Sequence, residues 1–450
     1  MDSFWPNRPY TNHLLLGATV LALLFCPLLA STRSTWPGLV ALSFASSGGL
    51  VLLWRRNQLT REQVLWGALL LRLAFLPLLP GLTDDLYRYV WDGWLQMEGI
   101  NPYRYVPKSD ALRSFQETSL YANLNSQSYY SVYPPLTQLV FAFAGWLYTH
   151  LGWHAAYYGF KGVVASAEFG GVVLLSRMTS PRNLLLYAWN PLVLLETAGQ
   201  GHTEALLIPC LFGLVWAVRR GQGRMASVLV AVAGMIKLYP FVLGPFLIRR
   251  YGWSAIWPGT VVVVGLSLPY AAPYTLPHLM DSVNLFARLF EFNAGPYYLT
   301  KYSFWVATGS DWSKQIGPAF RSLFLSCLPV LYVLDARQDL SIRSADMVAI
   351  GLFLVLSTTV HPWYLLPMIG LGVLNKRPAW PWLWLGTMSI GTYLFYIDGP
   401  YWGWIVLGWG GAFLLGVWLY SQGLVTLYEI IKRKRSSLTA VSKDHADSSA

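Results

Sequence analysis

Long stretches of apolar residues, each followed by a short polar stretch, recur along the whole chain. A helix of about 20 apolar residues spans the roughly 30 Å hydrocarbon core of a bilayer. The charged residues gather at the ends of the apolar stretches, which is typical of membrane spans rather than of amphipathic helices. The pattern therefore predicts an all-α, polytopic membrane protein with about 11 to 14 transmembrane helices, some of them in short hairpins.

The composition supports this class. The chain has 450 residues, 55% of them hydrophobic and only 12% charged, with a mean hydropathy of +0.42. Soluble domains carry roughly 25% charged residues, so a soluble enzyme and a disordered scaffold are poor interpretations. The formal net charge of +11 does not indicate nucleic-acid binding, because the basic clusters follow apolar stretches, as the positive-inside rule expects. These clusters are Arg55-Arg56, Arg219-Arg220, Arg249-Arg250, Lys376-Arg377 and Lys432 to Arg435.

Placing every basic cluster in the cytoplasm gives a topology. The map predicts one transmembrane domain over 1–431, with a large external loop at 81–134, a second at 273–316 and a disordered cytoplasmic tail at 432–450. The expected spans are 13–31, 37–54, 63–80, 182–196, 205–218, 225–236, 240–248, 255–272, 317–335, 346–360, 363–374, 379–396 and 401–420. Segments 135–149 and 157–176 break the parity, so either the first lies along the interface or Arg177 and Arg182 violate the rule.

Several paired spans are too short to cross a bilayer, because twelve helical residues reach only about 18 Å. Their connections are therefore expected below the membrane surface, where polar backbone must be buried in protein or line a cavity. The connections are residues 196–204, 237–240 and 361–364, and all three map to the same side as the first external loop.

The first external loop opens with two adjacent carboxylates, Asp84 and Asp85, directly after an apolar segment. A carboxylate here could remove a proton from an attacking hydroxyl, and the pair could hold a divalent cation, Mg²⁺ or Mn²⁺. The alternative is structural: Asp84 caps the next helix, and Asp85 or Asp92 pairs with Arg88. The loop is also rich in aromatic side chains that could stack on sugar rings, namely Tyr87, Tyr89, Trp91, Trp94 and Tyr103.

Lys237 lies within an apolar region, where an ammonium group is costly and usually functional. It could bind a phosphate as a point charge, or it could pair with a buried carboxylate such as Glu168 or Glu196. Gln200, His202 and Glu204 form a polar, glycine-containing connection suited to hydroxyl-rich ligands, or else a solvated turn. His361, in front of a proline, could serve either a functional or a structural role.

The ordered set of motifs between residues 80 and 365 resembles the GT-C superfamily of polytopic glycosyltransferases. It looks most like the bacterial mannosyltransferases that use polyprenyl-phosphate mannose, and it is similar to the first mannosyltransferase of GPI-anchor synthesis. Where the latter has two acidic residues separated by one, this chain has adjacent aspartates with Thr83 at the first position. The motifs are Asp84-Asp85, Asn101-Pro-Tyr103, Tyr133-Pro-Pro-Leu136, Trp189-Asn-Pro-Leu192, Gly199-Gln-Gly-His202, Lys237-Leu-Tyr-Pro240 and His361-Pro-Trp-Tyr364.

This resemblance implies an inverting sugar transfer from a polyprenyl-phosphate donor to an extracytoplasmic glycan or glycolipid. It implies a catalytic carboxylate at Asp85 first and Asp84 second, and we expect Lys237 and Arg88 to contact the donor phosphate. The multi-pass protein would lie among the lipids of a bacterial plasma (inner) membrane. The residues expected to bind substrate are Asp92, Asn101, Tyr103, Gln200, His202, Glu204, Tyr239 and His361.

Two other classes stay open. A secondary transporter or lipid flippase would also carry charges inside the membrane, although transporters commonly show internal repeats, and we find none here. An inactive scaffold for envelope assembly is the third hypothesis.

Overall fold

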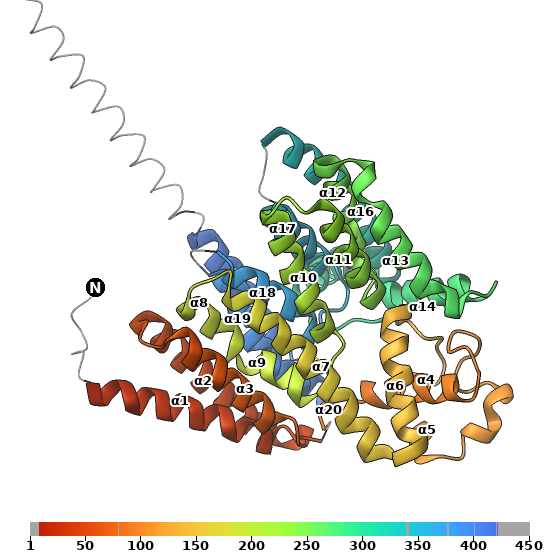
Figure 1. The fold of residues 1–450 in the computed structure, drawn as a ribbon, viewed down its shortest axis with the longest axis horizontal. Helices are drawn as coiled ribbons and strands as arrows, with labels where there is room; N and C mark the ends of the chain where they lie inside the picture. Colours follow the sequence, from red (N-terminus) through yellow and green to blue (C-terminus); the bar gives the residue numbers. More distant parts are fainter. Residues whose placement is uncertain are drawn as a thin grey trace, which may run out of the picture.

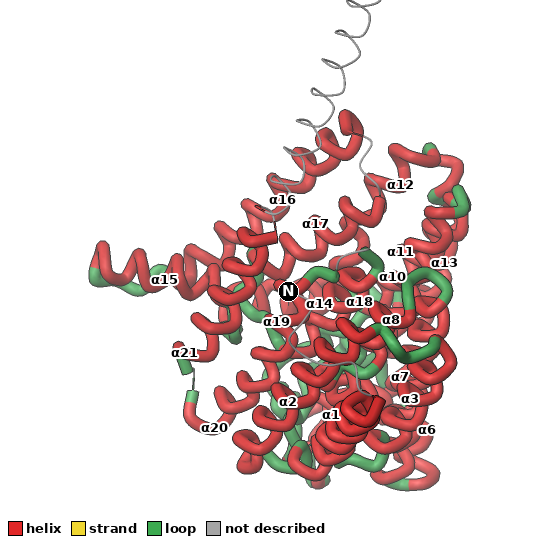
Figure 2. Tube along the Cα trace, turned by 90° about the vertical axis from the view of Figure 1, so that its left-hand side faces the viewer, coloured by secondary structure: helices red, strands yellow, loops and turns green. Residues whose placement is uncertain are grey.

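The computed structural model describes residues 9–79, 81–338, 342–375, 378–399, 401–419 and 421. These residues form helices and connecting turns, with no named strand among them (Figures 1 and 2). The expected tail at 432–450 and the basic pair at 376–377 lie outside the described residues. The α-helices are α1 (Pro9–Leu29), α2 (Trp36–Arg56), α3 (Arg61–Phe75), α4 (Asp85–Met97), α5 (Ser119–Ala122), α6 (Pro135–Leu151), α7 (Trp153–Ser176), α8 (Pro181–Ala188), α9 (Pro191–Leu194), α10 (Glu204–Arg219), α11 (Gly223–Ile236), α12 (Gly244–Tyr251), α13 (Trp257–Ser267), α14 (Thr275–Leu289), α15 (Gly295–Thr308), α16 (Ser313–Gln338), α17 (Ile342–Val355), α18 (Leu366–Val373), α19 (Trp380–Ser389), α20 (Phe395–Asp398) and α21 (Trp402–Ile405).

Five helical stretches in the described residues are long and apolar enough to cross a membrane, or seven if two bent pairs each count as one span. The five stretches are Asn12–Leu29, Arg33–Arg56, Trp153–Ser176, Ser313–Ala336 and Trp402–Leu419. This confirms the all-α polytopic class. The larger expected number of spans includes shorter apolar helices such as Gly223–Ile236 and Pro362–Val373, which do not cross by length alone.

The segments that carry the predicted cytoplasmic clusters gather at one end of the bundle. Arg182 lies over the ring of Trp54 at 5.2 Å, next to the basic end of α2. Further contacts connect helix ends near the other basic clusters. Asn183 Nδ2 donates to Asn375 O at 2.8 Å, and Arg250 pairs with Asp335 at 2.7 Å. This clustering agrees with the predicted topology, because helix ends on one side of a membrane must lie at one end of the molecule.

Helix α6, which broke the predicted parity, packs against α4 of the first external loop (Figure 1). The two helices cross at Gly93 and Gly145, where a Cβ on either glycine would lie 1.8 to 2.1 Å from backbone of the other helix. Near the start of α6, Gln138 bonds to α4 side chains, and near its end Tyr148 packs on Trp94 with ring centroids 5.5 Å apart. Helix α6 therefore packs both on α4 and on α7 of the bundle, and both alternatives for its place in the membrane stay predictions.

The second predicted external loop is mostly helical, since α14 and α15 fill most of it. It packs on the first loop: the ring of His278 stacks on Tyr130 at 3.8 Å, and Ser282 Oγ donates to Tyr130 O at 2.8 Å. The two external segments therefore form one layer on the same side of the bundle.

Candidate active site

Three interruptions in helices bring polar side chains close to the residues that lead into α4. The first lies between α9 and α10, where a π-helical turn, η3 (Leu195–Gly199), is followed by a bend of 101°. Gly201 has φ +77° in this bend, a conformation that side-chain-bearing residues rarely adopt. The second and third precede Pro240 and Pro362, and both Lys237 and His361 have extended backbone there.

Asp84 is the N-terminal flanking residue of α4, but its side chain makes no capping hydrogen bond. Instead, Arg33 Nη2 donates to both carboxylate oxygens at 3.1 and 3.2 Å, and Arg33 Nε donates to Leu82 O at 3.0 Å. The Asp84 side chain is 46% exposed. The ion pair therefore ties the loop between α1 and α2 to the start of α4.

Asp85 differs from Asp84 because it has no Lys or Arg within ion-pair distance among the described residues. Its carboxylate accepts from Asn125 Nδ2 at 3.1 Å and, at a long 3.4 Å, from Tyr89 Oη. It is half-buried. A carboxylate with only neutral donors keeps free lone pairs and can accept a further proton.

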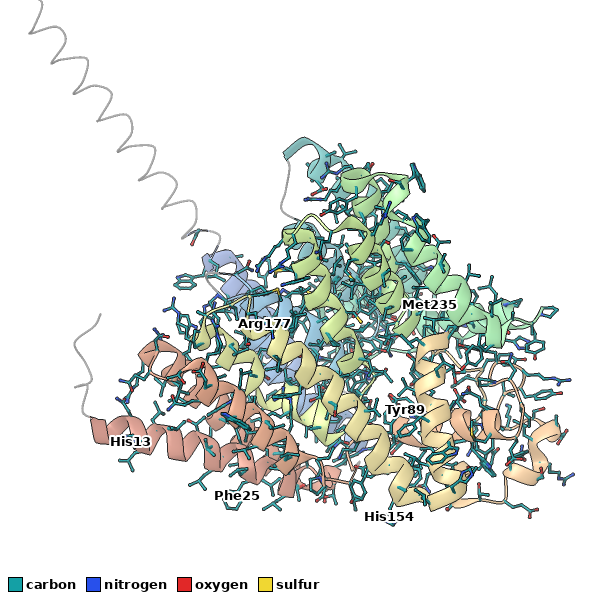
Figure 3. The ribbon with its side chains drawn as sticks, in the orientation of Figure 1. His13, Phe25, Tyr89, His154, Arg177 and Met235 are labelled. Carbon is teal, nitrogen blue, oxygen red and sulfur yellow. The ribbon has the colours of Figure 1, made fainter. Side chains whose placement is uncertain are left out.

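Two tyrosines connect Asp85 to the membrane part of the site. Tyr89 packs edge-on against Tyr133 with ring centroids 5.2 Å apart, at the junction of the loop helices and the bundle (Figure 3). Lys237 Nζ lies 5.2 Å from the centroid of Tyr133 on the other side. Burial, and then the charge of Asp85, raise the pKa of the Tyr133 phenol, so Tyr133 stays neutral and can donate a hydrogen bond.

Lys237 forms an ion pair with Glu204 at 2.9 Å, and a second ring, that of Tyr364, lies 5.8 Å from its Nζ. The Lys237 side chain is 19% exposed, whereas that of Glu204 is 2% exposed. The expected alternative partners, Glu168 and Glu196, are bonded elsewhere. An ammonium group has three donors, so the contact with Glu204 leaves capacity for an anion.

The η3–α10 connection contacts the chain just before the aspartates. His202 Nε2 lies 3.3 Å from Thr83 Oγ1, and Leu82 N donates to Gln200 Oε1 at 3.3 Å. His202 Nδ1 lies 2.7 Å from Glu196 Oε2, although not in the direction of a good hydrogen bond. Gln200 Nε2 is buried without a partner among the described residues.

His361 joins this group through ring contacts, whereas Tyr239 packs beside it on another ring. The ring of Trp363 stacks between those of His361, at 4.4 Å, and His202, at 3.8 Å. Tyr396 Oη lies 3.2 Å from His361 Nδ1. Tyr239 stacks on Phe353 at 4.9 Å. The structure thus brings one contiguous group together, which we call the tip cluster: Asp84, Asp85, Gln200, His202, Glu204, Lys237 and His361.

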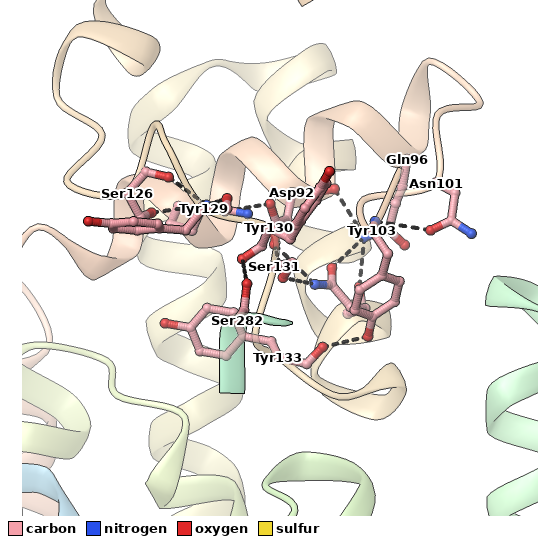
Figure 4. Close-up of polar contacts among 12 residues, drawn as sticks. Asp92, Gln96, Asn101, Tyr103, Ser126, Tyr129, Tyr130, Ser131, Tyr133 and Ser282 are labelled. Atoms are coloured by element: carbon pink, nitrogen blue, oxygen red, sulfur yellow. Dashed lines mark hydrogen bonds and ion pairs between the residues drawn. The ribbon is translucent and has the colours of Figure 1, made fainter. Parts of the chain in front are cut away.

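Arg88 and Asp92 are not part of the tip cluster, contrary to the expectation that they bind donor phosphate and substrate. Arg88 Nε donates to Asp92 Oδ1 at 2.7 Å, and its Nη1 donates to Ser126 O and Tyr129 O (Figure 4). Asp92 Oδ2 accepts from Ser131 and Gln138. Both side chains are almost wholly buried, so their contacts are those of the structural alternative.

Asn101 and Tyr103 also lie apart from the tip cluster. Asn101 Nδ2 donates to Tyr270 O at 3.2 Å, and Tyr103 O lies 2.7 Å from His278 Nδ1. Tyr103 is fully buried, and its Oη donates to Tyr133 O (Figure 4). These bonds join the two external segments, and nothing in them supports the expected contact with substrate.

The two aspartates have no third carboxylate, imidazole or thiolate grouped with them among the described residues. Asp84 is committed to Arg33, and Asp85 faces Asn125 and Tyr89. Within the described ranges no group of three or more His, Cys, Asp or Glu side chains could hold a metal. The expectation of Mg²⁺ or Mn²⁺ at this pair therefore gains no support from the donor set.

The sequence interpretation missed the roles of two residues in this region. Glu196 is fully buried and accepts from Tyr393 Oη at 2.7 and 2.9 Å, which fixes the carboxylate next to His202. Arg33 holds Asp84. Its signal was present, since Arg33 is a basic residue in a predicted external connection, where the positive-inside rule disfavours it.

The fold and the tip cluster define a polytopic helical membrane protein with an ionisable site built at helix breaks. Residues 10–251, more than half of the chain, match the family model described as alpha-(1->6)-mannopyranosyltransferase, N-terminal domain. The chain belongs to this family of mannosyltransferases, which confirms the resemblance in its motifs.

One further relative is informative. A segment of 63 residues is 33% identical to GPI mannosyltransferase 1 of Gibberella zeae, and covers 14% of this chain and 15% of that protein. The chain therefore matches about one seventh of its curated relative. No solved structure matches it.

Proposed function

We propose that the protein is an inverting mannosyltransferase that moves mannose from a polyprenyl phosphate to an extracytoplasmic glycan or glycolipid. Its family membership supports mannosyl transfer rather than the transporter or scaffold hypotheses. The observation that carries the proposal is the contrast between Asp84 and Asp85, because only Asp85 is free of a basic partner among the described residues.

Asp85 is the general base in this proposal. Its carboxylate accepts the proton of the acceptor hydroxyl while that oxygen attacks the anomeric carbon of mannose. The bond between that carbon and the phosphate oxygen breaks, and polyprenyl phosphate leaves with the bonding electrons. A single displacement from the opposite face inverts the anomeric configuration.

Lys237 is the cation for the leaving phosphate. It is partly exposed, and one contact with Glu204 leaves donors available. It is connected to Asp85 through Tyr133 and Tyr89. The polyprenyl chain would lie among apolar side chains of the bundle, since each buried methylene contributes about 0.8 kcal/mol. Both partners would meet on the external face of the membrane.

The test is transfer from radiolabelled polyprenyl-phosphate mannose to mannosyl acceptors by the purified protein in lipid nanodiscs. We expect Asp85→Asn to lower kcat by about 10²- to 10⁴-fold, the usual contribution of a general base. Asp281→Asn is the matched control, because Asp281 is an exposed aspartate of the second external segment. Wild-type activity of Asp85→Asn would remove Asp85 from this role. Transfer measured with and without EDTA tests the metal separately.

A further inference from the structure

A pocket of about 720 Å³ lies in the external layer, on a different face of α4 from Asp85 and Tyr89. Tyr87, Trp94 and Glu98 contribute to it from α4, seven and four residues apart, and this spacing places them along one side of a helix. Trp153, at the start of α7, lines the pocket beside Tyr87, and the two rings stack at 4.7 Å and 8°. The volume falls within the usual range of about 300 to 1,000 Å³ for ligand sites.

The pocket begins close to the reaction centre. Tyr87 N donates to Asp84 O at 3.2 Å, so the pocket starts one helical turn after the acidic pair. Partial burial, and second the charge of the nearby Asp84, raise the pKa of the Tyr87 phenol. From Tyr87 to Glu98 the helix advances by about 16 Å, a distance suited to a chain of linked rings rather than to one small molecule.

The wall chemistry matches hexose rings. Trp94 and Tyr148 line the pocket with aromatic rings, which suit the apolar C–H face of a sugar, and the exposed Glu98 carboxylate can accept from its hydroxyls. Ser119 and Asn123 add neutral polar groups at the rim. No Lys or Arg belongs to the described lining, so an anionic ligand such as a phosphate headgroup fits poorly.

We propose that this pocket, the α4 pocket, is a binding subsite for the distal hexose units of the acceptor glycan. The reacting end of the acceptor would lie at Asp85, and the chain would pass around the start of α4 into the pocket. This inference rests on the proposed function, because it gives the acceptor of that same site an oligosaccharide chain. It makes acceptor length, and not only the terminal sugar, a determinant of specificity.

The first experiment measures KM for mannose oligosaccharides of increasing length. For the wild type, KM should fall by about tenfold once the acceptor is long enough to reach the pocket. Trp94→Ala and Ser119→Trp, the latter filling the pocket from an exposed position, should abolish this gain. Trp146→Ala is the matched control, because Trp146 is an exposed tryptophan of α6 outside the pocket. A KM that does not depend on length in the wild type overturns the inference while leaving mannosyl transfer intact.

The second experiment measures oligosaccharide binding by calorimetry without any donor, so it does not depend on catalysis. Binding that Glu98→Gln and Trp94→Ala weaken by about tenfold, with unchanged melting temperatures, supports the pocket even if transfer fails. Equal binding to these variants and to the wild type overturns the pocket. Comparing a free oligosaccharide with the same glycan on a lipid anchor then separates the two sources of the ligand: equal affinity indicates a soluble glycan, and tighter binding of the anchored form indicates a glycolipid.

Discussion

Two groups of charged side chains include residues of α4, and they differ in burial and in their partners: Arg88 with Asp92, and Asp85 with Lys237, which follows α11. Arg88 and Asp92 are 4% and 0% exposed and bond to each other and to loop residues. Asp85 is half-buried and has no basic partner among the described residues, while Lys237 is 19% exposed. A fully satisfied buried pair maintains a fold, whereas groups with unused donors and acceptors at a wet surface remain available for substrate.

The largest expected effect is the loss of stability when the buried pair of Arg88 and Asp92 is broken. Asp92→Leu leaves the Arg88 guanidinium buried without its counter-ion, which costs about 3 to 5 kcal/mol. We expect a large drop in the unfolding temperature in detergent, and partial recovery in the double variant Arg88→Met with Asp92→Leu. Lys301→Met is the control, since it removes a pair in which both side chains are about a quarter exposed, and should cost no more than about 1 kcal/mol. Equal stability of Asp92→Leu and Lys301→Met would contradict the structural role.

The next largest effect is on donor binding, and it tests the role of Lys237. Lys237→Met should raise the donor KM by about 10- to 100-fold, because a hydrogen bond to a charged group contributes about 1.5 to 3 kcal/mol. The change also leaves Glu204 buried and unpaired, so stability should fall as well. Glu204→Gln added to Lys237→Met should restore stability without restoring the donor KM. If the double variant regained the wild-type KM, the Lys237 effect would be structural.

The smallest effect separates the two aspartates. Asp84→Asn removes an ion pair with Arg33 that is partly exposed, and such pairs contribute about 0 to 1 kcal/mol. We expect kcat within about threefold of the wild type, in contrast to the general-base loss of about 10²-fold or more in Asp85→Asn. Steady-state transfer assays on the two variants measure this directly. A loss in Asp84→Asn as large as that in Asp85→Asn would make Asp84 the base.

Much of the fold could be predicted because lipid imposes strict local rules. Helices lie over nearly all the apolar segments that were predicted to be spans. The segments next to the basic clusters, which were predicted to share one side, contact one another. The helices of the second external segment, α14 and α15, were missed because the map placed spans and loops by hydropathy alone. The packing of α6 on α4 was not visible from composition, because the contact between Gly93 and Gly145 joins residues far apart in the chain.

In the candidate site too, local features could be predicted from the sequence, whereas contacts between distant residues could not. The three helix interruptions were visible because the paired apolar segments around them are too short to cross a bilayer. The partners were not visible: Lys237 pairs with Glu204 rather than with the two carboxylates considered, and Arg33 reaches Asp84 across 51 positions of sequence.

By itself, the sequence determined that this chain is a helical membrane protein, which end of each helix is basic, and which residue types interrupt its helices. These properties depend on apolar length, charge position and backbone stereochemistry, all of which are local. Only the tertiary structure decided that Asp92 neutralises Arg88 while Asp85 stays available, and that an aromatic pocket begins one turn beyond Asp84. Which carboxylate meets which cation depends on how distant helices pack, and that is a property of the folded chain as a whole.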